Sequence, residues 1–449
     1  MSAAGNQQDS GLWAGAAKTD LTPRQSMFLF GYPHVPRHST GVHDPLECAA
    51  LYLRSGAGQC LILANDLIFF SRDFVADVRR RIEQRTGVPA GMIAVTATHT
   101  HSGPVTVNHI SNEADPVVPK ADPAYLEWIA SQMTEAGCAA VKAAEPATAG
   151  TGMARAEGVG TNRHDPSGPA DPEVPVLLVR SRRDGGALAC MVAYAMHPTV
   201  LHEDSTLISG DFPHFTRRQL VEQGHLPGSC VILYHNGASG NQSPRHVTKA
   251  NTFADARRLG EILGTAIARV LPSITTAAEL QISAHQTQVP LLRRELPSLA
   301  HAERAAAEAR RRHEDLKKAG APRTAVRTAE CDCFGAEETV ALARAEAENR
   351  LAAVAASCSP AELQVIGIGA DRWVFWPGEF FVEYGLAVKS RRPHTHLVTL
   401  ANGETQGYIV TPEAAARGGY EAANAVFSPD NGRVFVERTL ELLAESDKA

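Results

Sequence analysis

The stretch MIAVTATHTHSGP, residues 92–104, decides the fold because it joins a buried strand directly to reactive side chains. The residues before the histidines are apolar or β-branched, which predicts a strand over 92–98. His99 and His101 follow at its end, and a strand period of two places both imidazoles on one face. Two imidazoles facing one space are typical of a first-row metal site, with both as ligands or with one as a hydrogen-bonding neighbour of the other.

Predicted strands and helices alternate outward from this stretch. Two strands flank the turn Gly56-Ala-Gly58, and Asp122-Pro123 is a helix start signal. This alternation is typical of an α/β fold, in which mixed sheets are flanked by helices. The predicted strands are 46–55, 59–69, 92–98, 174–180, 188–196, 230–234, 363–368, 371–376 and 396–400, and the predicted helices are 71–86, 122–144, 212–223, 254–271 and 380–390.

Residues 298–357 differ from the rest of the chain because they are rich in Ala, Glu and Arg. They predict an antiparallel helical hairpin, with helices over 298–318 and 336–357 and a break at Gly320-Ala-Pro322. We expect this hairpin to be an insertion in one large catalytic domain, residues 12–449, that follows a flexible N-terminus over residues 1–11. A structural arm or dimer contact is favoured over a substrate lid, which makes the sequence compatible with a homo-oligomer.

The overall composition excludes several classes of protein. Of 449 residues, 44% are hydrophobic and 20% are charged, which is an ordinary globular balance. The net charge of -6 gives no reason to expect a nucleic-acid partner. The opening MSAAGNQQDSGLWAG lacks the basic start and apolar core of a secretory signal, and no stretch predicts a transmembrane segment. We therefore expect a cytoplasmic protein with reduced, scattered cysteines.

Two further side chains follow apolar strands in the same manner as His99. His197 follows CMVAYAM, and Glu379 follows DRWVFW and the turn Pro377-Gly378. Since α/β folds place their sites at the carboxyl ends of strands, these three side chains predict one metal site. Two imidazoles, a carboxylate and an open position for water are a well-known catalytic zinc set.

Each of these residues also has a simpler explanation when it is taken alone. His197 is compatible with a hydrogen-bonded core histidine, and His202 is a competing ligand in the same loop. Glu379 precedes the predicted helix 380–390, where a carboxylate stabilises the helix dipole without any metal.

Several motifs together resemble the catalytic domain of the neutral and alkaline non-lysosomal ceramidase family. The resemblance extends over nearly the whole chain, residues 12–440, and THTHSGP with the distant PGE is its most specific part. The motifs are GAAKTDLTP (15–23), GYPHVPRHSTGVHDPL (31–46), THTHSGP (98–104), MHPT (196–199), ISGDFP (208–213), PGE (377–379) and LANGETQGYIVTPE (400–413), followed by Tyr420-Glu421.

The resemblance implies a role for individual residues. The family's zinc ligands correspond to His99, His197, Glu379 and Tyr408, with one Zn²⁺ per chain. His101 corresponds to a residue behind the ligands or one that binds substrate. Arg163, in TNRHDP, corresponds to a residue that holds substrate or transition-state charge, and Tyr420 to a hydrogen-bond donor for the oxyanion.

Ser243 is a further candidate catalytic residue, because the serine of the corresponding family motif has been discussed as a nucleophile. The family's Gly-Asp-Val-Ser-Pro-Asn is Gly240-Asn-Gln-Ser-Pro-Arg245 here, so the acid before the serine is lost. No His–acid pair in the sequence is placed to activate Ser243. Metal-activated water is therefore favoured as the nucleophile.

The sequence as a whole predicts a zinc-dependent hydrolase that attacks the carbonyl of a linear, N-acyl type amide. The expected partner is a small-molecule amide or ester, with lipid-like compounds included. Ceramide itself is disfavoured, because the chain shows no export signal and no membrane-facing element, and it stops soon after the catalytic block. An ester or lactone hydrolase on the same scaffold and a catalytically silent binding homologue are the alternatives.

Overall fold

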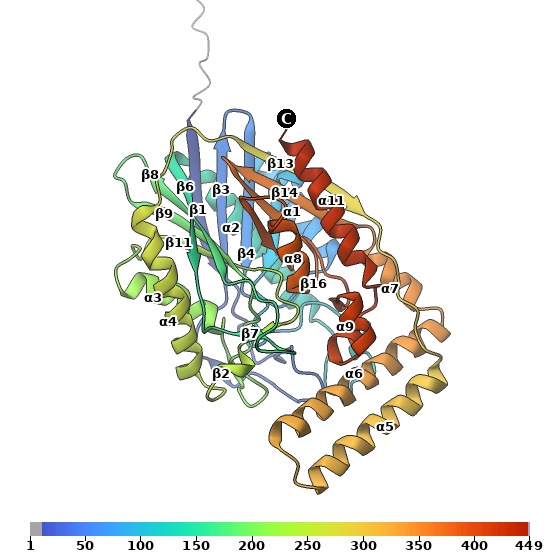
Figure 1. Ribbon diagram of the computed structural model, residues 1–449. Coiled ribbons are helices and arrows are strands. Elements are labelled where there is room, and N and C mark those ends of the chain that lie inside the picture. Colours follow the sequence, from blue (N-terminus) through green and yellow to red (C-terminus); the bar gives the residue numbers. More distant parts are fainter. Residues whose placement is uncertain (1–10, 448–449) are drawn as a thin grey trace, which may run out of the picture.

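Two β-sheets packed face to face form the centre of the computed structural model, which describes residues 11–447 (Figure 1). The predicted flexible N-terminus, residues 1–11, lies outside the described residues except for Gly11. The larger sheet is mixed, with parallel pairing at both of its ends and antiparallel pairing between them. Its eight strands lie in the order β11 (Val231–Asn236), β9 (Ala187–Tyr194), β8 (Glu173–Ser181), β6 (Glu145–Arg155), β1 (Leu12–Asp20), β3 (Glu47–Ser55), β4 (Gly58–Asn65) and β5 (Ile93–Ala97).

The smaller sheet packs against the larger one through alternate residues of its strands. Ile366 and Ile368 belong to the core between the sheets, whereas Leu363 and Val365 face the helices on the other side. This period of two is the reason that both faces of the sheet are apolar. The four strands lie in the order β13 (Ile282–Val289), β14 (Ala361–Ile368), β15 (Asp371–Phe375) and β17 (Thr395–Val398).

Helices cover the outer face of each sheet, so the mixed α/β class predicted from the sequence is confirmed. The larger sheet is covered by α1 (Arg72–Thr86), α2 (Pro123–Lys142), α3 (Phe212–Glu222) and α4 (Phe253–Val270), and the smaller one by α8 (Val382–Lys389) and α11 (Asp430–Ser446). As predicted, Asp122 caps α2 and Pro123 begins it. Within residues 11–447, no helix has the length and apolar character needed to cross a bilayer.

The strands predicted from the sequence do not include three of the longer strands, β1, β6 and β13, and the last two are the weakest in local propensity. Strand β6 reads EPATAGTGMAR and β13 reads ISAHQTQV, and neither shows the β-branched, apolar run that marks a strand. Each forms because neighbouring strands supply its hydrogen-bond partners, β8 for β6 and β14 for β13. Pairing in the tertiary structure thus overrides weak local propensity.

The predicted helical hairpin is present, but its second helix has different bounds. Helices α5 (Leu299–Lys318) and α6 (Arg323–Ala347) lie side by side and project from the body of the molecule (Figure 1). The second helix begins directly after Pro322 and not at residue 336. It ends before Asn349, whose positive φ of 57° separates it from α7 (Leu351–Cys358), because asparagine tolerates that conformation. That residues 12–449 form a single domain stays a prediction.

The core between the two sheets predicts that the same Leu→Ala substitution changes the free energy of unfolding much more at a buried position than at an exposed one. Leu233 is 0% exposed in this core, whereas Leu292 is 56% exposed. Leu233→Ala should lower the free energy of unfolding by about 2–5 kcal/mol, because it leaves a cavity that the sheets cannot close. Leu292→Ala should change it by less than about 0.5 kcal/mol. Urea denaturation followed by circular dichroism measures both, and equal losses would contradict the assigned core.

Candidate metal centre

Four segments far apart in the sequence meet at one end of the sheets. His99 comes just after β5, and His197 comes just after β9. Glu379 lies in the short strand β16 (Glu379–Phe380) and Tyr408 in β18 (Tyr408–Ile409). These two strands pair in parallel, with Glu379 directly opposite Tyr408, so one small ladder places a carboxylate beside a phenol.

The backbone at His99 differs from the regular strand predicted from the sequence. Strand β5 ends at Ala97, and His99 has a φ of 71°, in the left-handed region that is uncommon for residues other than glycine. Its N–H donates to the carbonyl of Leu67 at 2.9 Å, which holds this conformation. The period-two argument for His99 and His101 is therefore wrong, although their Nε2 atoms do lie 3.3 Å apart. Strained backbone of this kind is typical of functional sites.

Both His99 and His197 have a fixed orientation. Nδ1 of His99 lies 3.1 Å from the carbonyl oxygen of Ile68, and Nδ1 of His197 lies 2.8 Å from that of Ser239. Each Nδ1 therefore donates its proton to the backbone, which leaves the Nε2 lone pair directed into the site. Oε2 of Glu379 lies 3.2 Å from Nε2 of His99 and 3.0 Å from Nε2 of His197. This donor set fits a divalent cation.

The charges in the site favour the protonation states that a metal requires. Burial alone would raise the pKa of Glu379, but His99 and His197 hold this pKa well below its usual value. Burial, reinforced by the charge of Arg163, lowers the pKa of His197 to about 4. At neutral pH the carboxyl group is therefore ionised and the His197 imidazole is neutral, and these are the forms that bind metal.

Glu379 does not begin a helix, contrary to the sequence prediction for 380–390. Glu379 and Phe380 form β16, and α8 begins only at Val382. The carboxylate is 5% exposed and has two imidazoles as its neighbours. Stabilisation of a helix dipole therefore does not explain this residue, and the simpler alternative considered for it is wrong.

His101 contributes a third imidazole. The ligand atoms of His99, His101 and His197 lie within 4.8 Å of one another, and this cluster could hold a metal ion. Burial lowers the pKa of His101 well below its usual value, so the ring is neutral. Its Nδ1 is buried and has no hydrogen-bond partner among the described residues. A histidine with a free ring nitrogen next to two fixed ones is suited to binding either the metal or a substrate.

Arg163 approaches the cluster from the other side. Its Nη2 lies 3.0 Å from Nε2 of His197, and its Nη1 donates to Oε1 of Glu421 at 3.0 Å. The guanidinium carbon lies 5.8 Å from the centre of the Tyr408 ring. Burial would raise the pKa of Glu421, but hydrogen bonding from His164 and the charge of Arg163 lower it to about 2. The ionised Glu421 thus balances a positive charge that would otherwise repel a bound metal.

Ser243 lies at the edge of the site without the partners of a nucleophile. It belongs to β12 (Gln242–Ser243), is 7% exposed, and its Oγ accepts a hydrogen bond from the N–H of Arg245 at 3.2 Å. Within residues 11–447, no histidine or carboxylate makes a hydrogen bond to this Oγ. An activated serine requires an adjacent base, so the geometry gives Ser243 no nucleophilic advantage.

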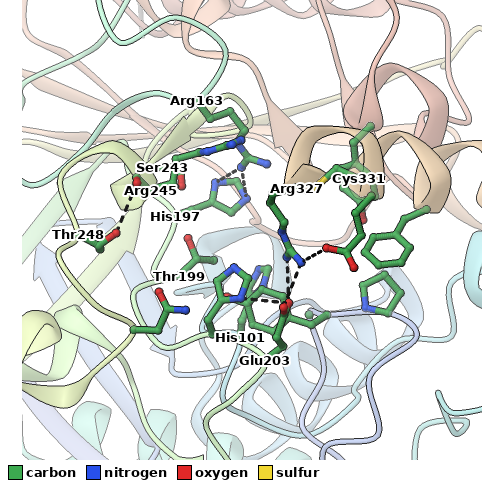
Figure 2. A pocket seen from close by; sticks show the side chains of 18 of the residues that line it. His101, Arg163, His197, Thr199, Glu203, Ser243, Arg245, Thr248, Arg327 and Cys331 are labelled. Atoms are coloured by element: carbon green, nitrogen blue, oxygen red, sulfur yellow. Dashed lines mark hydrogen bonds and ion pairs between the residues drawn. The ribbon is translucent and has the colours of Figure 1, made fainter. Parts of the chain in front are cut away.

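A cavity of about 490 Å³ opens onto these residues (Figure 2). Figure 2 shows Ser243, Arg245 and Thr248 on one side of it and Arg327 and Cys331 of α6 on the other. The lining also includes Gly31, Tyr32, Pro33, His101, Arg163, His197, Thr199, His202, Glu203, Asn251, Thr324, Val326, Glu330, Phe334, Tyr408 and Tyr420.

The helical hairpin is more than the surface arm that its composition suggests, because α6 forms a wall of this cavity. Arg327 reaches across to the loop after His197 and binds both carboxylate oxygens of Glu203, at 3.1 and 2.9 Å. It also donates to Glu330 at 2.8 Å. No sequence pattern indicated a role for these residues, because charged side chains on an Ala-rich helix are usually solvated.

The protein belongs to the layered α/β class and has a candidate metal centre. Its two sheets pack face to face, helices cover their outer faces, and a histidine cluster lies at one end. This fold is that of neutral ceramidase. The chain matches the crystal structure of neutral ceramidase from Pseudomonas aeruginosa with a TM-score of 0.75 and 17% sequence identity, over 97% of this chain and 74% of that one. It also matches a ceramidase complexed with C2, with a TM-score of 0.74 and 16% identity, over 96% and 74% of the two chains. No family model and no curated protein sequence matches the chain.

The donor set predicts a tightly bound divalent cation in the purified protein. We expect about one ion per chain, and His99→Ala or His197→Ala should remove it, because each substitution deletes an imidazole whose orientation the backbone fixes. Elemental analysis after gel filtration measures the metal content. His285→Ala, at a half-buried position of β13, is the matched control and should keep the ion. A His99→Ala protein with its full metal content would contradict the site.

The Glu421 carboxylate predicts a pH-dependent contribution to stability. Its pKa is lowered from 4.5 to about 2 in the folded protein, so its ionised form stabilises the fold above about pH 5. This stabilisation should be lost as the pH falls from about 4.5 towards 2. Glu421→Gln should therefore lower the free energy of unfolding most at about pH 6, and less at about pH 3. Denaturant titrations of both proteins test this, and a difference that grows towards acid pH would contradict it.

Proposed function

We propose that this protein is a metal-dependent hydrolase that cleaves the carbonyl–nitrogen bond of a linear N-acyl amide. One observation carries the proposal: two imidazoles with fixed tautomers and an ionised carboxylate converge beside a substrate-sized cavity that His197 lines. Cavities of about 300–1,000 Å³ are typical of small-molecule sites. The ceramidase fold supports the same reaction class, since those structures are of amide-cleaving enzymes.

Four residues would hold the metal: His99, His197, Glu379 and Tyr408. We infer zinc, because imidazole, carboxylate and phenolate oxygen together suit Zn²⁺. When bound, zinc supplies a Lewis acid for the carbonyl and lowers the pKa of water to about 7. Tyr408 is included because its strand pairing places it opposite Glu379.

His101 is assigned to the substrate and not to the metal. It lines the cavity, and its Nδ1 is free to make a hydrogen bond, whereas Nδ1 of His99 and Nδ1 of His197 are both engaged by the backbone. A polar group of the bound substrate would satisfy this buried nitrogen.

Arg163 and Tyr420 would stabilise the charge that develops on the carbonyl oxygen. Both line the cavity, and the ring of Tyr420 lies 6.2 Å from that of Tyr408. Arg163 is held by Glu421, so its guanidinium is positioned before the substrate arrives. Donors that are positioned in advance in a site shielded from water contribute strongly to catalysis. Water serves as the nucleophile, because Ser243 lacks a base.

The charged side chains on the outer wall of the cavity favour a substrate that is smaller or more polar than ceramide. Glu203, Arg327 and Glu330 line it, and Arg245 adds a cation for which residues 11–447 supply no ion-pair partner. Charged side chains on a cavity wall favour polar or oppositely charged ligand groups. The proposed chemistry is common to amides and esters, so a substrate panel is needed to separate them.

Hydrolysis of such a panel, N-acyl amides with matched esters and lactones, tests the proposed function. We expect cleavage of an amide that chelator abolishes and Zn²⁺ restores. His197→Ala should reduce kcat at least about a thousandfold, because the reaction loses the metal. Ser243→Ala should keep most of the rate.

Two results would contradict this assignment. If Ser243→Ala lowered kcat as strongly as His197→Ala while retaining its metal, serine would be the nucleophile. If a metal-loaded protein cleaved no compound of the panel but bound amides, the chain would be a binding protein on the ceramidase fold.

A further inference from the structure

Glu338 of α6 is buried in a hairpin whose other acidic residues lie mostly at the surface. It is 2% exposed, and its side chain contacts residues outside the hairpin. Its Oε1 accepts a hydrogen bond from Nδ2 of Asn112 at 3.2 Å, and its Oε2 accepts one from Nδ2 of Asn424 at 2.5 Å. The hydroxyl of Tyr420 lies 3.5 Å from Oε1.

This carboxyl group has no cationic partner within residues 11–447. Burial raises its pKa to about 7. Burying a carboxyl group without a cation is unfavourable, and an apolar residue would stabilise the same helix contact better. Stability of the hairpin therefore does not explain Glu338, whereas its contact with Tyr420 connects it to the site.

Helix α10 (Tyr420–Asn424), which carries Tyr420, is docked on α6. At Gly335 a Cβ atom would lie 2.9 Å from Cβ of Ala423 and 3.2 Å from Cα of Tyr420, so the two helices pack closely at this glycine. Thr339 adds a hydrogen bond from its Oγ1 to the carbonyl of Ala423 at 3.1 Å. A single helical turn has little stability of its own, so α6 sets the position of α10.

We propose that Glu338 is a positioning residue for Tyr420, and that α6 is thereby an integral part of the active site. The two asparagine amides fix the plane of the carboxyl group, and the fixed carboxyl group then holds the phenol oxygen at the cavity wall. This inference rests on the proposed function only for the role of Tyr420 in hydrolysis. The docking of Tyr420 by Glu338 stands on geometry alone.

A double-mutant cycle with Glu338→Gln and Tyr420→Phe tests the proposal on the metal-loaded protein. Glu338→Gln preserves the size of the side chain. It replaces one carboxylate oxygen, which accepts a hydrogen bond from an asparagine amide, with an NH₂ group that cannot accept it. It should lower kcat for an N-acyl aminocoumarin about tenfold with little change in KM, and Tyr420→Phe should lower kcat about a hundredfold. On the Tyr420→Phe background, Glu338→Gln should have no further effect, because its influence passes through the phenol.

Glu346→Gln is the matched control, because Glu346 lies on the same helix and its side chain is 46% exposed in an ion pair with Arg293. This variant should leave kcat and metal content unchanged. If Glu338→Gln lowered kcat by the same factor on both backgrounds, or did not lower it at all, the positioning role would be overturned.

Hydrogen exchange of residues 418–424 gives a readout that needs no substrate. Exchange there should become faster in Glu338→Gln and stay unchanged in Glu346→Gln. Unchanged exchange in Glu338→Gln would overturn the docking of Tyr420 by Glu338. Faster exchange in a protein that cleaves no compound would support the docking and refute only the proposed hydrolysis.

Discussion

The site depends on the contact between the Glu379 carboxylate and the Nε2 atoms of His99 and His197. Both imidazoles give their Nδ1 protons to backbone carbonyls, so they turn lone pairs and not protons towards the carboxylate. Nε2 of His99 faces, in addition, a nitrogen of His101 at 3.3 Å. Electron-rich atoms this close together repel one another in a buried site unless a cation lies nearby, and the Arg163 guanidinium, 3.0 Å from Nε2 of His197, supplies one such charge. A metal bound by the imidazoles and the carboxylate would supply further positive charge, and the proposed hydrolysis rests on it.

The fold maintains this contact by giving each ligand a separate anchor. His99 follows β5 in a left-handed conformation, His197 is bound to the carbonyl of Ser239, and Glu379 lies in the short ladder of β16 and β18. Sheets packed on both faces restrict how far such anchors can move. The three side chains are therefore held rigidly. The choice of small molecule then depends on the walls of the neighbouring cavity.

Helix α6 of the hairpin forms one of those walls. Helix α6 contacts the loop after His197 through Arg327 and Glu203, and it contacts α10 through Gly335 and Glu338. One helix thus contacts two sides of the cavity. A change in the length or charge of α6 would alter which small molecules fit the cavity without altering the proposed metal ligands, because the two are built on different elements. The proposed preference for substrates other than ceramide rests on these walls.

The sequence by itself determined the layered α/β class, most long helices and strands, and the set of residues around the centre, because apolar periodicity and His or Glu at strand ends are local signals. It did not determine β6 and β13, whose weak strand propensity is overridden by pairing partners. It also missed the conformation of His99, the strand at Glu379 and the inward face of α6. Only the tertiary structure decided these features, because their partners come from distant parts of the chain. The carbonyl of Ser239 orients His197, and Asn424 of α10 contacts the buried Glu338.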